Sequence, residues 1–286
     1  MEDALIHLKE ECNFKNRPRF IRHLHGGDIN TVYLIEAEEQ QWVVKQNNAI
    51  QFPLMLEKEY RAMQFLHQNS PLYYPKMLCH FTKNEQQFLV MEYIEEGLSN
   101  NKAQQHLGKG LAQQHRLSNS SFGWKEDNYI GSLKQVNTFK ESWNDFFAEN
   151  RLLFQAEQAF NKRLLVAQDL KQLERLCLRL NEMIPTEPAA LLHGDLWAGN
   201  YFIGQKNQPV LYDPAIYFGH REMDLAMTLL FGGFSTDFYM TYQEVYPLVK
   251  DWEERVKLFQ LYPNLVHLNL FGASYLDVVR KTLKKH

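Results

Sequence analysis

The ten residues LLHGDLWAGN, residues 191–200, constrain this chain more than any other stretch. A short apolar run, residues 189–192, opens into a polar loop, and a second apolar run, residues 201–203, follows the loop. Turn-forming residues 204–209 then precede a strand-like run that ends just before Asp213. This order predicts a strand, a loop, a hairpin and an acidic residue at the end of the hairpin.

The loop carries Asp195 and, five residues later, Asn200, which is the spacing of the catalytic loop of phosphotransferases. Asp213 stands where a second metal-binding acid is expected. Phosphoryl transfer needs one carboxylate at the attacking hydroxyl and oxygen ligands that hold Mg²⁺ against the nucleotide phosphates. Each of the three residues alone is an ordinary loop residue that bonds nearby backbone. Their combination around a hairpin favours the catalytic interpretation.

Composition narrows the class of protein. The 286 residues suffice for one large or two small domains, and 45% hydrophobic residues supply ample core material. A formal net charge of -3 and a pI near 6.4 show no basic surplus, so nucleic acid is not an expected partner. The N-terminus lacks the apolar core of a secretory signal, and no run approaches the ~18 to 20 apolar residues that cross a bilayer. We therefore expect no membrane association and a cytoplasmic protein.

The three cysteines are Cys12, Cys79 and Cys177. They are far apart in the sequence and form no CxxC pair, so neither a structural zinc site nor a disulfide framework is expected. We predict reduced, buried thiols.

The N-terminal third has the pattern of a nucleotide-binding sheet. Apolar and polar residues alternate over residues 20–24 and 31–36, on either side of a turn that contains Gly26 and Gly27. A third strand ends at Lys45, and a glycine turn followed by a strand lysine is typical of sites that cover nucleotide phosphates. The turn lacks the G-x-G-x-x-G spacing, so a plain hairpin stays open for the two glycines. A solvated edge position stays open for Lys45.

A helix predicted over residues 53–66 supplies the partner of that lysine. Counting by three and four from Leu56 places Glu59 on the apolar, inward stripe, whereas Glu57 lies off it. A buried carboxylate needs a cation nearby. We therefore expect Glu59 to pair with Lys45, and an unrelated arginine is the alternative partner.

A strand over residues 87–94 runs into the acidic and glycine residues 95–97, which read as a hinge between two domains. The backbone groups of Met91, Glu92 and Tyr93 are the expected contacts of an adenine ring. A plain edge strand is the alternative interpretation.

The remainder of the chain has a helical pattern, with helices predicted over residues 103–115, 143–153 and 157–184. An aromatic, glycine-containing loop, residues 122–132, lies between the first two, and such loops are often functional. Asp224 precedes an apolar helical run. We expect it to cap that helix, with a bond back to the catalytic loop as the alternative.

Four segments, GGDIN, FGWKEDNYIGS, LLHGDLWAGN and YFGHREMDLAM, resemble the fructosamine-3-kinase, or ketosamine kinase, family. The resemblance runs from about Phe20 to the end of the chain. It is far more specific than the HGD…N core shared with aminoglycoside phosphotransferases and choline kinases. The resemblance implies a protein-kinase-like, two-lobed α+β fold, with a small antiparallel sheet and a helix over residues 1–94. A larger, mainly helical catalytic and substrate lobe would occupy residues 95–286.

The resemblance also implies ATP and Mg²⁺ as cofactors and a role for each site residue. Asp195 resembles the catalytic base, and Lys45 resembles the lysine on the phosphates, with Glu59 as its ion-pair partner. The implied metal ligands are Asn200 and Asp213, and the glycine turn and the hinge carry the implied nucleotide contacts Gly26, Gly27, Met91, Glu92 and Tyr93. Trp197 resembles a bulky substrate-site residue, with packing under the loop as the alternative, and His267 is a weaker substrate candidate with a structural alternative.

One position departs from the family pattern. Many relatives carry a cysteine in the glycine turn, where this chain has Asp28. A thiol switch or a disulfide dimer through this turn is therefore not expected. An acid beside phosphates would also weaken nucleotide binding unless it points outward.

These observations support the hypothesis of an ATP-dependent kinase that phosphorylates a hydroxyl of a ketose joined to an amine. The expected substrates are ribulosamine, erythrulosamine or fructosamine adducts, on small molecules or on glycated protein lysines, in repair of early glycation. A small-molecule kinase of the aminoglycoside or choline type is one alternative. A catalytically silent nucleotide-binding relative is the other.

Overall fold

The structure is a computed structural model of the chain, and it describes residues 2–24 and 29–285. The chain divides into two compact units. Unit 1 comprises Met1–Ser99 and Phe202–Asp213, and unit 2 comprises Asn100–Tyr201 and Pro214–His286. Unit 1 therefore includes the hairpin that follows the catalytic loop in the sequence, in addition to the N-terminal segment.

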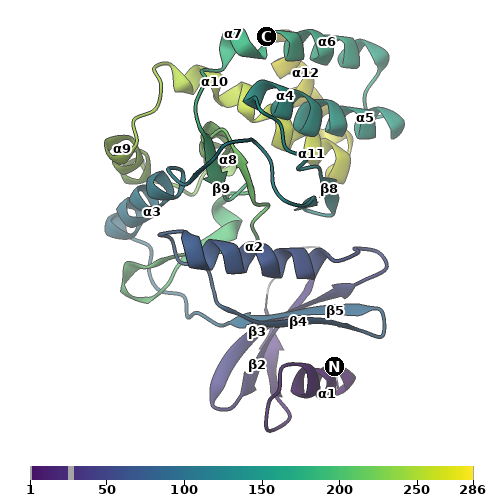
Figure 1. Cartoon of the computed structure of the whole chain (residues 1–286), viewed down its shortest axis with the longest axis vertical. Helices are drawn as coiled ribbons and strands as arrows, with labels where there is room; N and C mark the ends of the chain where they lie inside the picture. Colours follow the sequence, from purple (N-terminus) through teal and green to yellow (C-terminus); the bar gives the residue numbers. More distant parts are fainter. Residues whose placement is uncertain (1, 25–28, 286) are drawn as a thin grey trace. The chain divides into compact units, whose positions relative to one another are not determined.

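Unit 1 is built on a five-stranded antiparallel sheet with the order β1-β2-β3-β5-β4 (Figure 1). β2 pairs with β3 and β4 pairs with β5, each through a short connection, whereas α2 separates β3 from β4 in the sequence and β3 pairs with β5. In the register, Lys45 lies opposite Val32 on one side and Leu89 on the other. The strands are β1 (Arg19–His23), β2 (Thr31–Ala37), β3 (Gln40–Asn48), β4 (Met77–Lys83) and β5 (Gln86–Glu92).

The two faces of this sheet carry separate cores. Val44, Val90 and Phe88 pack with α1 (Glu2–Glu11) in one cluster. Leu89 and Met91 pack with α2 (Met55–Asn69) in the other. Because side chains alternate along a strand, Lys45 points to the face opposite that of Val44, which is the α2 face.

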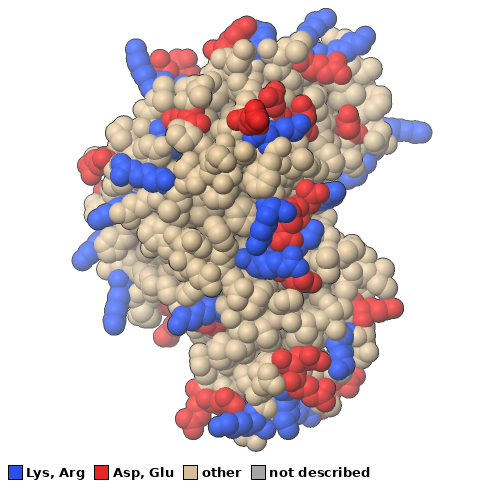
Figure 2. Space-filling model, in the orientation of Figure 1, with Lys and Arg blue, Asp and Glu red and all other residues tan. Residues whose placement is uncertain are grey.

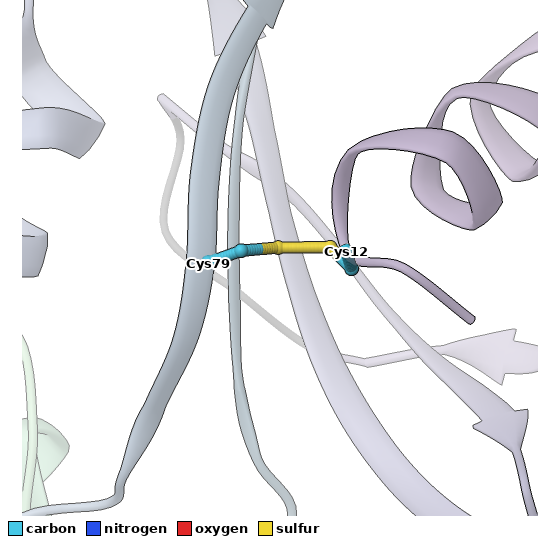
Figure 3. Close-up of a disulfide and its surroundings, with 2 residues drawn as sticks. All are labelled: Cys12 and Cys79. Carbon is cyan, nitrogen blue, oxygen red and sulfur yellow. A yellow bond between two sulfur atoms is a disulfide. The ribbon is translucent and has the colours of Figure 1, made fainter.

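A disulfide joins Cys12, just after α1, to Cys79 in β4 (Figure 3). The prediction that all three cysteines are reduced thiols without a disulfide was therefore wrong. Helix α1 packs on the outer face of the sheet and brings the two Cα atoms to 5.9 Å, within the range that a disulfide spans. Their separation of 67 residues hid this juxtaposition from any spacing rule. Cys177 is free, and burial raises the pKa of its thiol to about 12.

Unit 2 is mainly helical and encloses a small sheet of order β12-β9-β6. Within it α5 packs on α11 and α6 packs on α12 (Figure 1). The α-helices of unit 2, with the π-helix η1 between two of them, are α3 (Asn101–Gln114), α4 (Trp143–Phe147), η1 (Ala148–Leu153), α5 (Phe154–Asn161), α6 (Ala167–Leu178), α7 (Leu180–Met183), α8 (Glu222–Phe231), α9 (Thr236–Val245), α10 (Trp252–Phe259), α11 (Leu261–Phe271) and α12 (Leu276–Lys285). The strands are β6 (Ser118–Asn119), β9 (Ala189–Leu192) and β12 (Tyr217–Gly219), with a separate hairpin of β7 (Asn128–Ile130) and β8 (Leu133–Gln135).

The single helix predicted over residues 157–184 was wrong, because the structure has three helices there, α5, α6 and α7. The first break falls at Arg163, which adopts a left-handed backbone conformation with φ 61°. A helix cannot continue through such a residue. The leucine stripe thus belongs to successive short helices packed in the unit.

The predicted α+β class is confirmed by the antiparallel sheet of unit 1 and the helices of unit 2. Figure 2 shows basic and acidic side chains interspersed over the face that it draws. None of the helices in the described part of the chain has both the length and the apolar content to cross a membrane.

We expect reduction of the disulfide to destabilise the protein by about 4 kcal/mol, the loop entropy for a closed loop of 67 residues. The measurement is urea unfolding of the oxidised protein with and without a reducing agent, and of Cys79→Ser. Cys177→Ser is the matched control and should unfold as the parent does in both conditions. Two titratable thiols at Cys12 and Cys79 in the protein isolated without reductant would contradict the bond.

Candidate active site

Lys45 is a buried cation held by two acids of unit 1. The lysine side chain is 6% exposed, and its Nζ lies 2.6 Å from Oε1 of Glu59 on α2. Nζ also forms an ion pair with Oδ1 of Asp213, at the end of the hairpin. The inward stripe that favours Glu59 over Glu57 therefore corresponds to the contact in the structure. Glu57 instead pairs with Arg61 one turn along the helix.

The buried ion pairs shift the pKa values of Lys45 and Glu59. Burial alone would lower the pKa of Lys45, but the negative charges of Asp213 and Glu59 outweigh it and raise that pKa. Burial raises the pKa of Glu59 to about 7, against the opposing attraction of Lys45. The Lys45 ammonium thus forms ion pairs with the carboxylates of both Glu59 and Asp213. Asp213 adopts a left-handed conformation with φ 55°, uncommon for a residue with a side chain.

The catalytic loop of unit 2 is fixed by a buried acid. The loop follows the fully buried strand β9, and Asp224 accepts hydrogen bonds from the backbone N–H groups of His193 at 2.8 Å and Gly194 at 2.9 Å. Burial would raise the pKa of Asp224, but the hydrogen bond and charge of His115 lower it. The expected cap was wrong, since Asp224 lies within the first turn of α8 and Arg221 is the N-cap residue. The alternative, a bond back to the loop, is what the structure shows.

Asp195 and Asn200 lie side by side in this loop. The Asn200 side-chain nitrogen donates to the backbone oxygen of Asp195 at 2.8 Å and to its Oδ2 at 2.9 Å. Because the amide nitrogen faces Asp195, the amide oxygen is the atom of Asn200 suited to bind a cation. The contact also orients the Asp195 carboxylate within the loop.

The donor set fits a hard cation that also binds phosphate. Asn200 and Asp213 flank the hairpin of β10 (Tyr201–Ile203) and β11 (Pro209–Leu211) in the chain, and they offer an amide and a carboxylate oxygen. Mg²⁺ takes such oxygen ligands and usually keeps waters or substrate phosphates in its other positions. The described residues contain no group of three or more His, Cys, Asp or Glu side chains that could hold a metal ion.

The aromatic loop, residues 122–132, and the strand β8 that follows it support the segment after Asp213. Asn128 donates to the backbone oxygen of Ile216 at 2.9 Å, and Gln135 donates to that of Ala215 at 3.0 Å. The Ala215 oxygen in turn lies against Gly194, where an added Cβ would come within 2.0 Å of it. The aromatic loop therefore supports the loop of residues 193–200 through the Ala215–Ile216 segment. This contact gives a reason for the burial of Asn128.

The backbone N–H groups of the predicted hinge residues differ in whether they form hydrogen bonds within unit 1. The N–H of Glu92 donates to the Lys76 oxygen at 2.9 Å, and the N–H of Tyr93 donates to the Gln41 oxygen at 3.4 Å. The carboxylate of Glu92 accepts from the Tyr73 hydroxyl at 2.6 Å. Among the described residues, the N–H of Ile94 makes no such bond. The sequence analysis did not single out Ile94, whose position two residues beyond the end of β5 leaves its N–H outside the sheet ladder.

Trp197 is 38% exposed and lies on the catalytic loop two residues beyond Asp195. Its indole covers Gly199, where an added Cβ would come within 2.2 Å of the ring. The edge of the indole faces Phe231, with ring centroids 5.8 Å apart. The absence of a side chain at Gly199 thus leaves room for the indole of Trp197, part of whose surface stays accessible to solvent.

His267 lies on α11, with its ring centroid 5.4 Å from that of Phe231. Burial lowers its pKa below the usual value, so the ring is neutral at pH 7. Its Nδ1 is buried and has no hydrogen-bond partner among the described residues. His267 is therefore held by aromatic packing.

The predicted contacts Gly26 and Gly27, and the departure at Asp28, lie outside the described residues. The described strands on either side are paired, and the N–H of Leu24 donates to the Val32 oxygen at 2.9 Å.

Comparison with known proteins places these features in a family. The model of the fructosamine kinase family matches residues 2–286. A probable ketoamine kinase of Synechocystis is 38% identical over 271 residues, covering 92% of this chain and 89% of that protein. A protein-ribulosamine 3-kinase of Arabidopsis thaliana is 34% identical over 255 residues, covering 87% of this chain and 77% of that protein.

Solved structures agree. The structure of a candidate fructosamine-3-kinase from Thermobifida fusca superposes with a TM-score of 0.87 at 30% identity, covering 99% of each chain. An aminoglycoside phosphotransferase structure gives a TM-score of 0.65 at 14% identity, covering 98% of each chain, and this shows a shared kinase-like fold alone.

The pKa of Glu59, raised from 4.5 to about 7, predicts a pH-dependent stability. A carboxyl with a raised pKa in the folded state stabilises it fully below the unfolded pKa and loses that contribution as pH rises through the folded pKa. Relative to Glu59→Gln, the parent should therefore lose on the order of 3 kcal/mol of unfolding free energy between pH 4.5 and about 7.

Urea unfolding of both proteins across this pH range measures the difference. Glu57→Gln controls for the loss of a negative charge from the same helix. A parent-minus-variant difference that stays flat from pH 4.5 to 7.5 would show that Glu59 is ionised throughout.

Proposed function

This chain belongs to the fructosamine kinase family, and from that membership we propose that it transfers the γ-phosphoryl group of ATP to a hydroxyl of a ketose joined to an amine. The observation that carries the proposal is the contact of Asn200 with Asp195 in a loop fixed by the buried Asp224. This contact supports the proposal because phosphoryl transfer uses a carboxylate and a metal-binding amide from one loop.

Asp195 is the proposed base. Its carboxylate accepts the hydrogen bond of the sugar hydroxyl, orients the hydroxyl oxygen toward the γ-phosphorus, and takes the proton as the new P–O bond forms. Lys45 would balance negative charge on the nucleotide phosphates. Asn200 and Asp213 would hold Mg²⁺, which, when bound, supplies positive charge to the phosphates.

The backbone of the hinge would receive the adenine. The N–H groups of Glu92 and Tyr93 are used inside unit 1, so the N–H of Ile94 is the proposed donor to the ring. The neighbouring carbonyl groups of the segment from Met91 to Tyr93 remain the proposed acceptors. This arrangement needs no particular side chain, because backbone N–H and C=O groups alone would form the hydrogen bonds to the edge of the adenine ring.

The proposed acceptor is a ketosamine. The names of the relatives support it, because they describe ketoamine and ribulosamine kinases. Trp197 and His267 are the proposed substrate contacts, since an accessible indole offers a flat apolar face to a sugar or its amine substituent. Adducts on small molecules and on protein lysines both fit this chemistry. Repair of early glycation products in the cytoplasm is the role we propose.

Asp195→Asn should lower kcat by about 10²- to 10⁴-fold, because it removes the base and keeps the shape of the side chain. The measurement is ATP consumption with a ribulosamine or fructosamine acceptor at saturating Mg²⁺. Asp277→Asn, an exposed acid of unit 2 on α12, is the control and should keep the parental rate. Turnover within a few-fold of the parent in Asp195→Asn would remove the base from the mechanism.

Gly199→Ala should raise KM for the ketosamine by on the order of tenfold, since misplacement of a contact by about 1 Å has large effects. The methyl group would occupy the seat of the Trp197 indole and push the ring aside. Steady-state kinetics with both substrates measures this, and KM for ATP should stay unchanged. An unaltered ketosamine KM, with a shifted tryptophan fluorescence showing that the ring has moved, would exclude Trp197 from substrate binding.

A further inference from the structure

Arg151 is a buried cation of unit 2 that no acid neutralises. Its side chain, on η1, is fully buried and donates to the backbone oxygen of Val136 and to Oδ1 of Asn137 at 2.8 Å. No Asp or Glu among the residues that the structure describes forms an ion pair with it. Arg221, which is also buried, instead pairs with both carboxylate oxygens of Glu187. A buried charge is unfavourable unless its surroundings compensate for it, so the neighbours of Arg151 need to supply that compensation.

Aromatic rings cover the guanidinium. Its central carbon lies 4.1 Å from the ring centroid of Tyr217, 4.5 Å from that of Phe146 and 5.3 Å from that of Tyr262. The face of an aromatic ring attracts a cation, and the attraction is strongest where water is excluded. Nε of Arg151 has no hydrogen-bond partner among the described residues. The rings therefore supply compensation that the hydrogen bonds leave incomplete.

One of these rings lies against the catalytic loop. Tyr217 in β12 is paired with Leu192, which is the last residue of β9 and directly precedes the loop. A Cβ added at Gly194 would come within 3.3 Å of the Tyr217 ring. Gly194 has a φ of 85°, which a residue with a side chain rarely adopts. The Tyr217 ring therefore lies against both the guanidinium and the backbone that immediately precedes Asp195.

Tyr262 connects the guanidinium to the same glycine by a second route. Its hydroxyl donates to Oε1 of Gln135 at 2.8 Å, and Nε2 of Gln135 donates to the Ala215 oxygen at 3.0 Å. That oxygen lies against Gly194. Two of the rings that cover Arg151 thus lead to one point of the loop, the residue before the proposed base.

The charges of two acids, Asp224 and Asp195, reach the same rings. Burial raises the pKa of Tyr217 to about 12, and the charge of Arg151 opposes this rise whereas that of Asp224 adds to it. Burial also raises the pKa of Tyr262, again against the charge of Arg151 and with a contribution from Asp195. The guanidinium and the acids that fix and form the catalytic loop therefore act on common neighbours.

We propose that Arg151 is a positioning residue for phosphoryl transfer. Its charge holds the Tyr217 ring by a cation–π contact, and the ring holds the Gly194–Asp195 backbone in the geometry that orients the carboxylate of the proposed base. The inference rests on the proposed function and adds a residue that acts through the loop. The charge is as necessary as the shape, because a neutral group of the same shape would not attract the ring face.

Arg151→Ala should lower kcat about tenfold to a hundredfold while the KM values for ATP and for a ribulosamine stay within about threefold, because the substrates still bind but the base is misplaced. Arg175→Ala, at an exposed arginine of α6, is the control and should keep the parental values. A parental kcat in a folded Arg151→Ala, as judged by circular dichroism, would overturn the inference.

Added guanidinium tests the role of the charge in Arg151→Ala. At a concentration that leaves the parent folded and active, guanidinium should raise the kcat of this variant about tenfold, since it restores a cation over the rings. Urea has the same shape without the charge and should not raise kcat. No increase with guanidinium, or an equal increase with urea, overturns the inference.

Tyr217 supplies a test that remains informative if Arg151→Ala does not fold. Tyr217→Phe keeps the ring face and should stay within about twofold of the parental kcat, whereas Tyr217→Leu removes the ring and should lose as much as Arg151→Ala. Where both variants fold, combining Tyr217→Leu with Arg151→Ala should cause little further loss, since both remove the same contact. Equal losses in Tyr217→Phe and Tyr217→Leu, or additive losses in the double variant, overturn the inference.

Hydrogen exchange without substrates separates this inference from the proposed function. The amide hydrogens of His193 and Gly194, both bonded to Asp224, should exchange faster in Tyr217→Leu than in the parent, while those of β3 in unit 1 keep their rates. Faster exchange confined to the loop supports the inference even if the parent phosphorylates no ketosamine, in which case the proposed function alone falls. Unchanged exchange in the loop, or faster exchange throughout the chain, overturns the inference and leaves the proposed kinase activity standing.

Discussion

The burial of the Lys45 ammonium is the constraint on which unit 1 depends. An isolated buried cation costs many kcal/mol, so it persists only with charged partners at hydrogen-bond distance. One partner, Glu59, comes from the inward stripe of α2, and the other, Asp213, comes from a hairpin more than a hundred residues away in the sequence. This requirement accounts for the inclusion of Phe202–Asp213 in the N-terminal unit. It also gives a reason for the left-handed backbone at Asp213, whose carboxylate must reach the lysine.

Unit 2 contains a buried side chain of the opposite charge, which also needs polar partners. Asp224 is a buried anion, and its partners are His115 and two backbone N–H groups of the catalytic loop. The Asp224 carboxylate therefore links the loop to α8. Loss of these hydrogen bonds would leave a buried carboxylate without its partners. Asp224 and the Asn200 amide fix the backbone and the carboxylate of the loop that carries Asp195. Asn128 and Gln135 support the neighbouring segment through the backbone oxygens of Ile216 and Ala215, respectively. The rigid parts of the site are thus set by buried polar contacts, each with a strict geometric demand.

Local periodicity explains which of these features the sequence reveals. The alternation around β2 and β3, the stripe that selects Glu59, and the spacing of Asp195 and Asn200 are written in neighbouring residues, and the structure has the corresponding elements and contacts. The disulfide could not be predicted, because it depends on α1 packing across the sheet onto β4. The helix break at Arg163 is set by a single backbone dihedral angle within an uninterrupted leucine pattern. The position of Ile94 beyond β5, and of Phe231 and Phe271 at the ends of their helices, depends on where these elements end, and periodicity resolves element boundaries least.

The contrast between buried charges and exposed rings has a consequence for specificity. Lys45 and Asp224 are each tied to several partners, so a substitution at either position disturbs stability and catalysis together. Phe231 and Phe271 lie at helix ends with half or more of their surface exposed, so their side chains can change at little cost to folding. Folding therefore constrains the buried residues of the proposed site far more than it constrains the exposed phenylalanines at the ends of α8 and α11. A kinase arranged in this way can adjust its range of acceptors without altering the residues that perform the transfer.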